Sequence, residues 1–351
     1  MLHSRVCTKV LQCDKYSSTL CNMRDKKIGD VVPDYLQWRK RQGFAHNTTR
    51  NDKSALGFLT RTLSPERLVS DIHPSDIADV LEACLDKRQP SSVNAVHATL
   101  SGFFQWCRAN QIIGPDHNPM LGVRYRKVAV KERQRLRLDE FDSFLDVAPD
   151  PRHRIMAALG LFLFLRSSEA VALRVKDVDL TGGTIAVTIQ KTNDFDRMPL
   201  SSELDRELRI WLTHYQSVKG NLDPNWKLVP PVARGWRDSN CYNPTGKISR
   251  PEDLIKRCLN AYGWEDTHWE GMHCLRRSGA RAWFDSLVEM GTDGALRLVQ
   301  TQLHHRSVTM TERYLGLTGD RINRDKRLRG QAMFPVPTQK NVIPLKRVAE
   351  R

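Results

Sequence analysis

The sequence predicts a mainly α-helical protein with a small antiparallel β-sheet, divided into a helical first domain and a mixed α/β second domain. Apolar residues recur at helical spacing through most of the chain. One β-branched run, at 184–191, is followed by a turn at Asn193-Asp194 and a short return strand ending at Leu200, which indicates a hairpin. A basic, poorly periodic run at 123–137 separates two helical regions. The 351 residues are enough for two or three domains, each with its own core.

The first helical region extends from about Ile28 to Gly122. Its candidate helix starts are side chains that are preferred N-caps, at Asn47, Ser75, and Ser91 or Ser92. The last of these precedes the clearest helix, in which apolar side chains recur at helical spacing: Val96, Leu100, Phe103, Phe104 and Cys107. Core packing is the leading interpretation of its aromatic residues. We therefore expect a bundle of four or five helices, closed by Asn118-Pro119.

The second region combines helices with the hairpin. Asp139 is a candidate N-cap for a helix beginning at Glu140. The apolar run 155–165 predicts a buried helix that stops before Arg166 and is too short to cross a membrane. Further helices are expected at 204–215, 251–262, 273–290, 294–303 and 308–314. The segment 219–250 is rich in Pro, Gly, Asn and Trp, and predicts a long loop.

The charge balance points to a polyanionic partner. The net charge of +15 makes nucleic acid the leading candidate, and a hydrophobic content of 40% is normal for a soluble globular protein. A membrane partner would need an apolar span, a basic amphipathic helix or a lipid anchor, and the sequence carries no clear signal for any of them. The basic run 123–137 is interpreted either as a solvated surface or as a linker that follows a phosphate backbone.

The cysteines and the chain ends narrow the class further. The eight cysteines form no C-x-x-C pair, which argues against structural zinc and favours reduced thiols in the cytoplasm. Residues 1–26 have no clear periodicity and no signal-peptide pattern, and are expected to form a flexible arm. The tail 331–351 ends in a short apolar and basic piece, which is a candidate docking segment for a neighbouring subunit.

Imidazole and guanidinium groups gather in two segments near the end of the chain. One contains His273 and Arg276, and the other contains His305 and is followed by Tyr314. Such groups hold and neutralise a phosphate without a metal. A tyrosine placed just beyond them is a candidate nucleophile. This pattern predicts chemistry on a phosphate ester.

Four motifs, in order, resemble the tyrosine recombinase or phage integrase family, which includes the λ-integrase-like and Xer/Cre-type site-specific recombinases. They are Leu165-Arg166-Ser167-Ser168-Glu169, Lys191-Thr192 with Arg197-Met198-Pro199-Leu200, His273-Cys274-Leu275-Arg276, and Leu303 through His305 to Tyr314. The resemblance covers about 28–317 and implies a helical SAM-like core-binding domain at 27–122, a basic linker at 123–137 and a mixed α/β catalytic domain at 138–330. Phe164 and His304 stand where the family has glycine, and Arg277 where it often has histidine.

The resemblance implies a role for each residue of these motifs. Tyr314 is expected to attack the scissile phosphate, while Arg166 and Arg276 neutralise the transition state. His273 and His305 add hydrogen bonds, with His273 a candidate base for the tyrosine proton, and Lys191 protonates the leaving oxygen. Glu169 is expected either to fix these basic groups or to be a plain solvated glutamate. Spacing favours His305 over His304 as the active-site histidine.

The implied activity is site-specific recombination through a 3′-phosphotyrosyl intermediate, for integration, excision or resolution of DNA. It requires no ATP, cofactor or metal, and the chain has no phosphate-binding G-x-x-x-x-G-K-[ST] loop. Expected partners are double-stranded DNA carrying recombination sites, a homotetramer on two duplexes, and accessory DNA-bending or directionality proteins, in the bacterial or phage-host cytoplasm and associated with the nucleoid. Expected DNA-binding residues lie in the basic run: Arg124, Arg126, Lys127, Lys131, Arg133 and Arg135.

Two alternatives remain open. A type IB topoisomerase would use similar chemistry to relax supercoils without a specific site. A DNA-binding regulator of the same fold would bind DNA without cleaving it. Such a protein would be expected to lose some of the catalytic residue types, whereas this chain has the required residue type at all six positions. The helical first domain and the motif spacing favour a recombinase.

Overall fold

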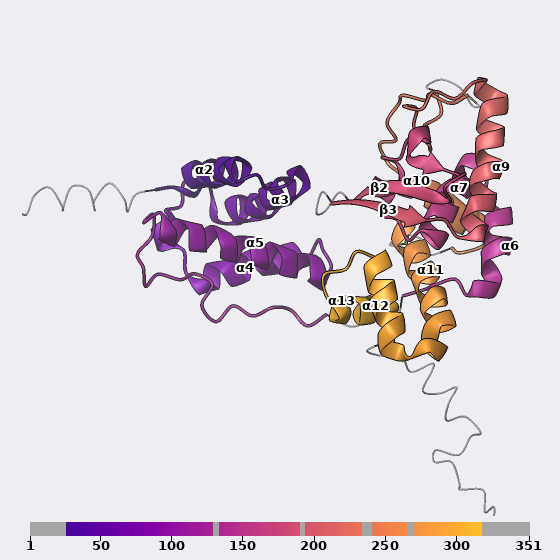
Figure 1. The fold of residues 1–351 in the computed structure, drawn as a ribbon. Helices are drawn as coiled ribbons and strands as arrows, with labels where there is room; N and C mark the ends of the chain where they lie inside the picture. Colours follow the sequence, from indigo (N-terminus) through magenta and orange to yellow (C-terminus); the bar gives the residue numbers. More distant parts are fainter. Residues whose placement is uncertain (1–25, 129–132, 190–193, 234–240, 266–269, 318–351) are drawn as a thin grey trace, which may run out of the picture. The chain divides into compact units, whose positions relative to one another are not determined.

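The computed structural model describes residues 26–128, 133–189, 194–233, 241–265 and 270–317. The chain divides into two compact units, Met1–Lys131 and Glu132–Arg351. The expected arm at 1–26 and tail at 331–351 fall almost entirely outside the described residues, as does the end of the expected catalytic domain. The predicted fold class, mainly helical with a small antiparallel sheet, is confirmed (Figure 1).

The first unit is a helical bundle. Its α-helices within the described residues are α2 (Ile28–Arg41), α3 (His46–Leu63), α4 (Pro74–Leu85) and α5 (Pro90–Ala109), with a 3-10 turn η1 (Val69–Asp71) between α3 and α4. Helix α3 packs against each of the other three helices. The aromatic side chains expected in the core, Phe103 and Phe104, are fully buried. The prediction of a four- or five-helix bundle is therefore confirmed.

The predicted N-caps in this bundle were wrong by two or three residues. Helices α4 and α5 each begin at a proline, after His73 and Gln89 respectively. Proline is favoured at the first helical position because its fixed φ suits the helix and its missing N–H would have no partner there. Asp76 then caps α4, its carboxylate accepting a hydrogen bond from the His73 amide at 2.8 Å. The serines and Asn47 thus lie inside the first turns instead of capping them.

The second unit places its sheet among helices. Among the residues that the structure describes, three strands run antiparallel in the order β1 (Val178–Asp179), β2 (Thr184–Ile189), β3 (Asp194–Pro199). Ile185 pairs with Met198, and these two side chains are buried on one face of the sheet. The β2–β3 hairpin is the one that the sequence predicts, although its tip at 190–193 falls outside the described residues.

The helices of the second unit also follow the predicted order. They are α6 (Phe141–Asp146), α7 (Pro151–Phe162), α8 (Ser167–Ala170), α9 (Ser202–Lys219), α10 (Glu252–Ala261), α11 (Met272–Leu287), α12 (Thr292–Gln302) and α13 (Val308–Leu315), with 3-10 turns η2 (Leu138–Glu140), η3 (Val175–Asp177) and η4 (Val288–Met290). Glu140 ends η2 and precedes α6, so the predicted cap at Asp139 was wrong. None of the described helices is both long and apolar enough to cross a membrane.

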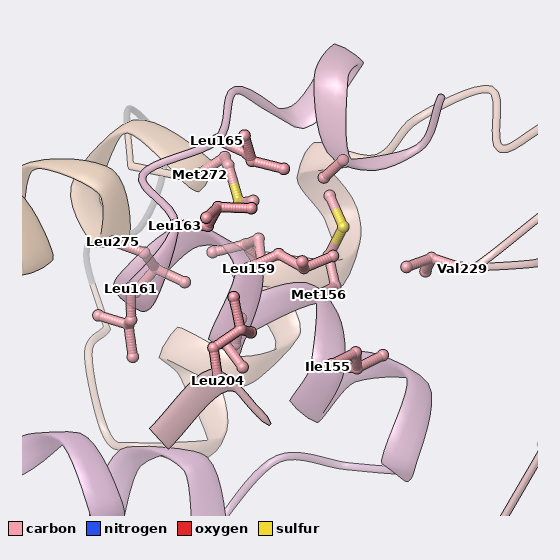
Figure 2. Close-up of a cluster of buried hydrophobic side chains, with 14 of the residues drawn as sticks. Ile155, Met156, Leu159, Leu161, Leu163, Leu165, Leu204, Val229, Met272 and Leu275 are labelled. Atoms are coloured by element: carbon pink, nitrogen blue, oxygen red, sulfur yellow. The ribbon is translucent and has the colours of Figure 1, made fainter. Parts of the chain in front are cut away.

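Helix α7 is the centre of the second unit. It packs against α6, α9, α10 and α11, and its buried side chains join Met272 and Leu275 of α11 (Figure 2). Two glycines permit a close approach of α7 and the residues after it to α11. A Cβ on Gly160 would lie 2.9 Å from Met272 Sδ, and one on Gly279 would clash with the Leu161 carbonyl. This packing fixes the helix that carries His273 and Arg276 against the chain segment that leads to Arg166.

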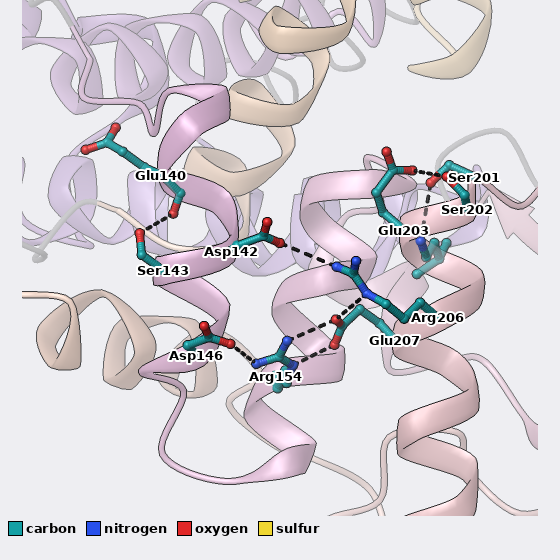
Figure 3. Close-up of polar contacts among 11 residues, drawn as sticks. Glu140, Asp142, Ser143, Asp146, Arg154, Ser201, Ser202, Glu203, Arg206 and Glu207 are labelled. Carbon is teal, nitrogen blue, oxygen red and sulfur yellow. Dashed lines mark hydrogen bonds and ion pairs between the residues drawn. The ribbon is translucent and has the colours of Figure 1, made fainter.

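A set of polar contacts joins α7 to α6 and α9 (Figure 3). The guanidinium of Arg154 donates to both carboxylate oxygens of Glu207 on α9, at 2.6 and 3.0 Å, and to Asp146 on α6 at 2.7 Å. The side chain of Glu207 is 1% exposed. A two-pronged guanidinium–carboxylate pair satisfies such a buried charge, and removal of one partner would leave the other uncompensated.

A smaller apolar cluster lies around α11, α12 and α13. It contains Phe164 together with Phe284, Leu296, Leu303 and Leu315, among others. Phe164 belongs to the segment just before Arg166, and its ring packs beside that of Trp283 with centroids 5.9 Å apart. The cluster therefore packs the turn before Arg166 and helices α12 and α13 onto the same helix, α11.

Candidate active site

Arg166 is presented by a sharp turn at the end of α7. Phe164 adopts a left-handed conformation with φ of 55°, which reverses the chain after the helix. Arg166 is then the N-cap residue of α8, and the carboxylate of Glu169 accepts from its backbone amide at 2.8 Å. The other oxygen of Glu169 accepts from the Arg166 guanidinium at 2.7 Å. The turn therefore fixes both the backbone and the side chain of Arg166.

Arg276 lies on the inner side of α11 and is 2% exposed. Its guanidinium donates to the carbonyl oxygens of Phe164 and Leu303, the second at 2.6 Å. Burial lowers the pKa of Arg276 to about 10, while the nearby Tyr314 and Glu169 oppose that shift. The side chain thus stays cationic at neutral pH. By its two carbonyl contacts Arg276 joins the turn before Arg166 to the turn before α13.

Glu169 lies between the two arginines. It is 2% exposed, and its Oε2 lies 3.8 Å from the Arg276 guanidinium in addition to the contacts with Arg166. Two cations close together repel one another, and a buried carboxylate between them offsets that repulsion. Of the two interpretations of Glu169, the one in which it fixes the basic groups fits this geometry, and a plain solvated glutamate does not.

The turn between α12 and α13 holds His305. Its ring Nδ1 lies 3.1 Å from the Thr311 hydroxyl on α13, and its carbonyl accepts from the Gln300 side chain at 3.0 Å. The side chain of Ser307 caps α13 by accepting from the Met310 amide. These contacts hold the imidazole beside Tyr314, with ring centroids 5.2 Å apart in an edge-to-face arrangement.

Tyr314 lies near the end of α13 and is half-buried. Its hydroxyl donates to the carbonyl of His273 at 3.3 Å, and the Arg276 guanidinium lies 6.0 Å from its ring centroid. Burial raises the pKa of Tyr314, and the positive charges of Arg276, Arg277 and Arg166 oppose that rise. A phenol in this position is neutral at pH 7 and loses its proton most readily when a base takes it.

His273 is in the first turn of α11. Loss of hydration around the ring lowers its pKa, the charges of Arg276, Arg166 and Arg277 lower it further, and Glu252 opposes them. A histidine with a lowered pKa is neutral at pH 7 and can accept a proton. The backbone carbonyl of the same residue, His273, accepts the hydrogen bond from the Tyr314 hydroxyl.

The structure thus brings together five of the six residues expected to act in the site: Arg166, His273, Arg276, His305 and Tyr314. Glu169 contacts the two arginines among them. The sixth, Lys191, lies outside the described residues, in the sequence segment between β2 and β3.

Two residues that differ from the family pattern have clear contacts. His304 has φ of 52°, and its Nε2 lies 2.9 Å from Asp196 of β3, so its side chain is directed to the hairpin. Arg277 donates to the Gln134 carbonyl at 2.6 Å and to Glu270 at 3.1 Å. Arg277 therefore holds the segment that enters the second unit against α11.

Sequence reasoning missed Glu252, the first residue of α10. Its carboxylate accepts from the Ser167 hydroxyl and from the Met272 amide, next to Arg166 and His273 respectively. No motif announces this residue, because it is brought to the site by tertiary packing from a region read only as a helix start. A glutamate in the first helical turn is a general capping signal and does not by itself indicate a site.

The expected DNA-binding residues of the basic run have different environments. Arg124, Lys127 and Arg133 are exposed, Arg135 is half-buried, and Lys131 lies outside the described residues. Arg126 is held to the first unit: its guanidinium pairs with Glu82 at 2.8 Å and its amide donates to Asn94 at 2.8 Å. Leu136 is buried in the second unit, where its amide donates to Ser278 at 2.8 Å. Both ends of the run are therefore attached to the units that they join.

Comparison with known proteins gives consistent matches. Residues 134–320 match the model of the phage integrase family. The chain is 27% identical over 168 residues to the prophage integrase IntE of Escherichia coli (strain K12), covering 48% of this chain and 44% of that protein. It is 26% identical over 162 residues to a tyrosine recombinase of Pseudothermotoga lettingae, covering 46% and 56%. The chain thus matches about half the length of these curated relatives.

Solved structures of λ integrase are similar in fold. One is a dimer bound to a COC′ core site, with a TM-score of 0.66 and 19% identity over 88% of this chain and 83% of that one. Another is a tetramer bound to a Holliday junction, with a TM-score of 0.64 and 19% identity over 86% and 84%. At this identity the similarity establishes the fold.

Proposed function

Because the chain belongs to the phage integrase family, we propose that it is a site-specific DNA recombinase that cleaves and rejoins strands through a 3′-phosphotyrosyl intermediate. The observation that carries this proposal is the position of Tyr314. Its hydroxyl is hydrogen-bonded to the carbonyl of His273, and its ring centroid lies 6.0 Å from the guanidinium of Arg276 and 5.2 Å from that of the His305 imidazole. A nucleophile beside two phosphate-binding groups is the arrangement that phosphodiester transfer requires.

The first step forms one bond and breaks another at the same phosphorus atom. The Tyr314 oxygen attacks the scissile phosphate, the bond from phosphorus to the 5′-oxygen breaks, and the DNA is left with a 3′-phosphotyrosyl link and a free 5′-hydroxyl. Negative charge builds up on the non-bridging oxygens in the transition state. The planar forks of Arg166 and Arg276 are suited to neutralise it, because they stay cationic and are held by Glu169 and backbone carbonyls.

Two protons must move in this step. His273, with its lowered pKa, is the candidate base for the tyrosine proton. Lys191 is the candidate acid for the leaving 5′-oxygen, a role carried over from the motif alone. The phosphotyrosyl link keeps the ester bond energy, so a 5′-hydroxyl from another strand reverses the reaction and joins the new partner without ATP.

The protein partners and substrates follow from the same proposal. Each of the two units contacts duplex DNA, with Arg124, Lys127 and Arg133 of the basic run along the backbone. The λ integrase tetramer on a Holliday junction supports a homotetramer that exchanges strands between two duplexes. The activity serves integration, excision or resolution of a DNA element in the bacterial or phage-host cytoplasm, with accessory proteins that bend DNA or set direction.

Covalent trapping at low salt, in EDTA, tests the proposal and requires no chosen target sequence. The protein is mixed with a pool of nicked duplexes of randomised sequence. After cleavage, the short fragment that carries the free 5′-hydroxyl diffuses away, and its loss prevents religation. Protein-linked DNA that survives denaturation is recovered and sequenced. Wild type is expected to enrich one sequence, whereas Tyr314→Phe is expected to give no linked DNA.

Tyr262→Phe is the matched control, because Tyr262 lies in the same unit and its hydroxyl contacts Glu140, away from the site. Linked DNA in the Tyr314→Phe variant would remove Tyr314 from the mechanism. Trapping without sequence enrichment, together with relaxation of supercoiled plasmid, would indicate a topoisomerase. Enrichment of a bound sequence by filter retention, with no covalent link in any variant, would indicate a regulator that binds without cleaving.

A further inference from the structure

Glu252 contacts two separate parts of the site from outside every motif. It is the first residue of α10 and is half-buried. One carboxylate oxygen accepts from the hydroxyl of Ser167, the residue after Arg166. The other accepts from the amide of Met272 at 3.1 Å, the residue before His273. A single carboxylate therefore bridges the turn that carries one catalytic candidate and the helix that carries another.

The surroundings of Glu252 are built to admit this carboxylate. The amide of Met272 belongs to the first turn of α11, where backbone N–H groups have no partner within the helix and attract negative charge. Gly271 precedes that turn, and a Cβ at this position would clash with the Glu252 carboxylate. The chain thus has glycine where a side chain would displace the acceptor. Since α11 has no side-chain cap of its own, Glu252 takes that place from another helix.

We propose that Glu252 is a positioning residue of the active site, which holds the first turn of α11, with His273, against the turn that carries Arg166. The catalytic consequence of this inference rests on the proposed recombinase function, whereas the contacts of Glu252 are independent of that function. Within the described part of the chain, the hydrogen bonds of Glu252 go to the Ser167 hydroxyl and the Met272 amide, and not to Tyr314 or to either arginine of the site. Glu252 acts through Ser167 and the α11 backbone.

The position of Glu252 also gives its charge an effect on His273. The charged and titratable groups around that imidazole are Arg276 and Arg277 on α11, Arg166 before α8, Glu252 on α10 and Tyr314 on α13. The three arginines lower the pKa of His273 and Glu252 raises it. Replacement of the Glu252 carboxylate with an uncharged amide of the same shape should therefore lower the pKa of His273 further.

The first test measures the His273 imidazole directly, without DNA. In protein labelled on histidine, its NMR signal is assigned by its loss in His273→Gln, and its titration is compared in wild type, Glu252→Gln and Asp253→Asn. Asp253 is the matched control, because it is the next carboxylate along α10 and pairs with Arg250 instead. Glu252→Gln is expected to shift the titration to lower pH, and Asp253→Asn to leave it in place. Equal titrations in all three proteins would overturn the assignment.

The second test uses the trapping assay, once wild type has yielded a substrate. Glu252→Ala is expected to slow covalent complex formation about tenfold, the equivalent of one lost hydrogen bond to a charged group, and Glu252→Gln to move the acidic limb of the pH–rate profile to lower pH. Thermal unfolding of each variant separates this effect from loss of fold. A wild type that forms no complex refutes the proposed function, and the NMR titration then decides the role of Glu252. If both Glu252 variants are trapped at the same rate and with the same pH profile as Asp253→Asn, the inference about Glu252 is overturned and the proposed function stands.

Discussion

The imidazole Nε2 of His304 lies 2.9 Å from Oδ2 of Asp196, so the turn between α12 and α13 is joined to strand β3. His304 makes this contact from a left-handed conformation, with φ of 52°, and Phe164 has a similar φ of 55°. These are the two positions where the family pattern has glycine, the residue that adopts positive φ without strain. The chain therefore keeps the backbone geometry of both turns and uses the two side chains for new contacts.

Returning each position to glycine should separate backbone strain from side-chain packing. A left-handed non-glycine residue costs about 1 kcal/mol, and both changes relieve it. Phe164 is 5% exposed and packs beside Trp283, so Phe164→Gly also loses a buried ring and should destabilise the second unit by about 2–4 kcal/mol. His304 is half-buried and its pair with Asp196 is partly solvated, so His304→Gly should change stability by less than about 1 kcal/mol.

Urea unfolding followed by tryptophan fluorescence measures this difference. Asp196→Ala, which removes the partner without altering the backbone of the turn, is the control for the His304 contact. Equal destabilisation by the two glycine variants would show that the ring of Phe164 contributes little to packing.

Asp150 provides a prediction on stability and pH. Its side chain is 9% exposed, caps α7 by accepting from the His153 amide at 2.9 Å, and lies 2.8 Å from His153 Nδ1. Burial alone would raise the pKa of Asp150, but the contacts with His153 and the charge of Arg152 outweigh burial and lower it. A carboxyl whose pKa is lowered on folding adds stability above its unfolded pKa of about 3.9, and this is lost as pH falls through the folded value.

Asp150→Asn keeps a good N-cap and removes only the charge. It should lower the free energy of unfolding at pH 7 by about 1–3 kcal/mol, with the difference from wild type shrinking below about pH 4. Urea titrations at several pH values measure it, with the exposed Asp139→Asn as the control. A difference that stays constant from pH 7 to pH 3 would contradict the charge-based explanation.

The salt dependence of DNA binding should distinguish the cations of the basic run that contact phosphate from the one that is paired within the protein. Arg124 and Lys127 are exposed, whereas Arg126 is paired with Glu82. Each cation that neutralises a phosphate adds about 0.9 to the slope of log K against log salt concentration. Arg124→Ala and Lys127→Ala should each reduce the slope by about that amount, and Arg126→Ala by clearly less. Fluorescence anisotropy over a range of salt concentrations measures the slope, and a wild-type slope in all three variants would remove the run from the interface.

Much of the fold was predictable because its signals are local. The hairpin follows from the β-branched run ending at Ile189, and the buried helix α7 from a continuous apolar stretch. The five candidate site residues that the structure brings together could be proposed because motif spacing fixes their order along the chain. The bridging role of Glu252 could not, since its partners Ser167 and Met272 lie 85 and 20 residues away in the sequence. The helix starts were missed where proline at the first position outweighed a nearby serine.

Arg276→Lys tests whether charge alone is sufficient at the centre of the site. Lysine keeps the positive charge but lacks the planar fork that contacts the carbonyls of Phe164 and Leu303. Covalent trapping should fall by about 100-fold or more, the usual consequence of losing one oriented transition-state donor. Arg154→Lys is the control, because Arg154 pairs with a buried glutamate elsewhere in the unit. Trapping by Arg276→Lys within a few-fold of wild type would show that a point charge suffices.

Replacing the leaving oxygen isolates the role proposed for Lys191. An alkoxide needs a proton as it leaves, whereas a thiolate, whose conjugate thiol has a pKa of about 8.5, does not. Lys191→Ala should therefore slow trapping on ordinary DNA strongly and react at near wild-type rate on DNA with sulfur in place of the bridging 5′-oxygen. His273→Gln, which removes a candidate base and not an acid, should remain slow on both substrates. If sulfur restores both variants equally, or neither, Lys191 is not the acid that protonates the leaving group.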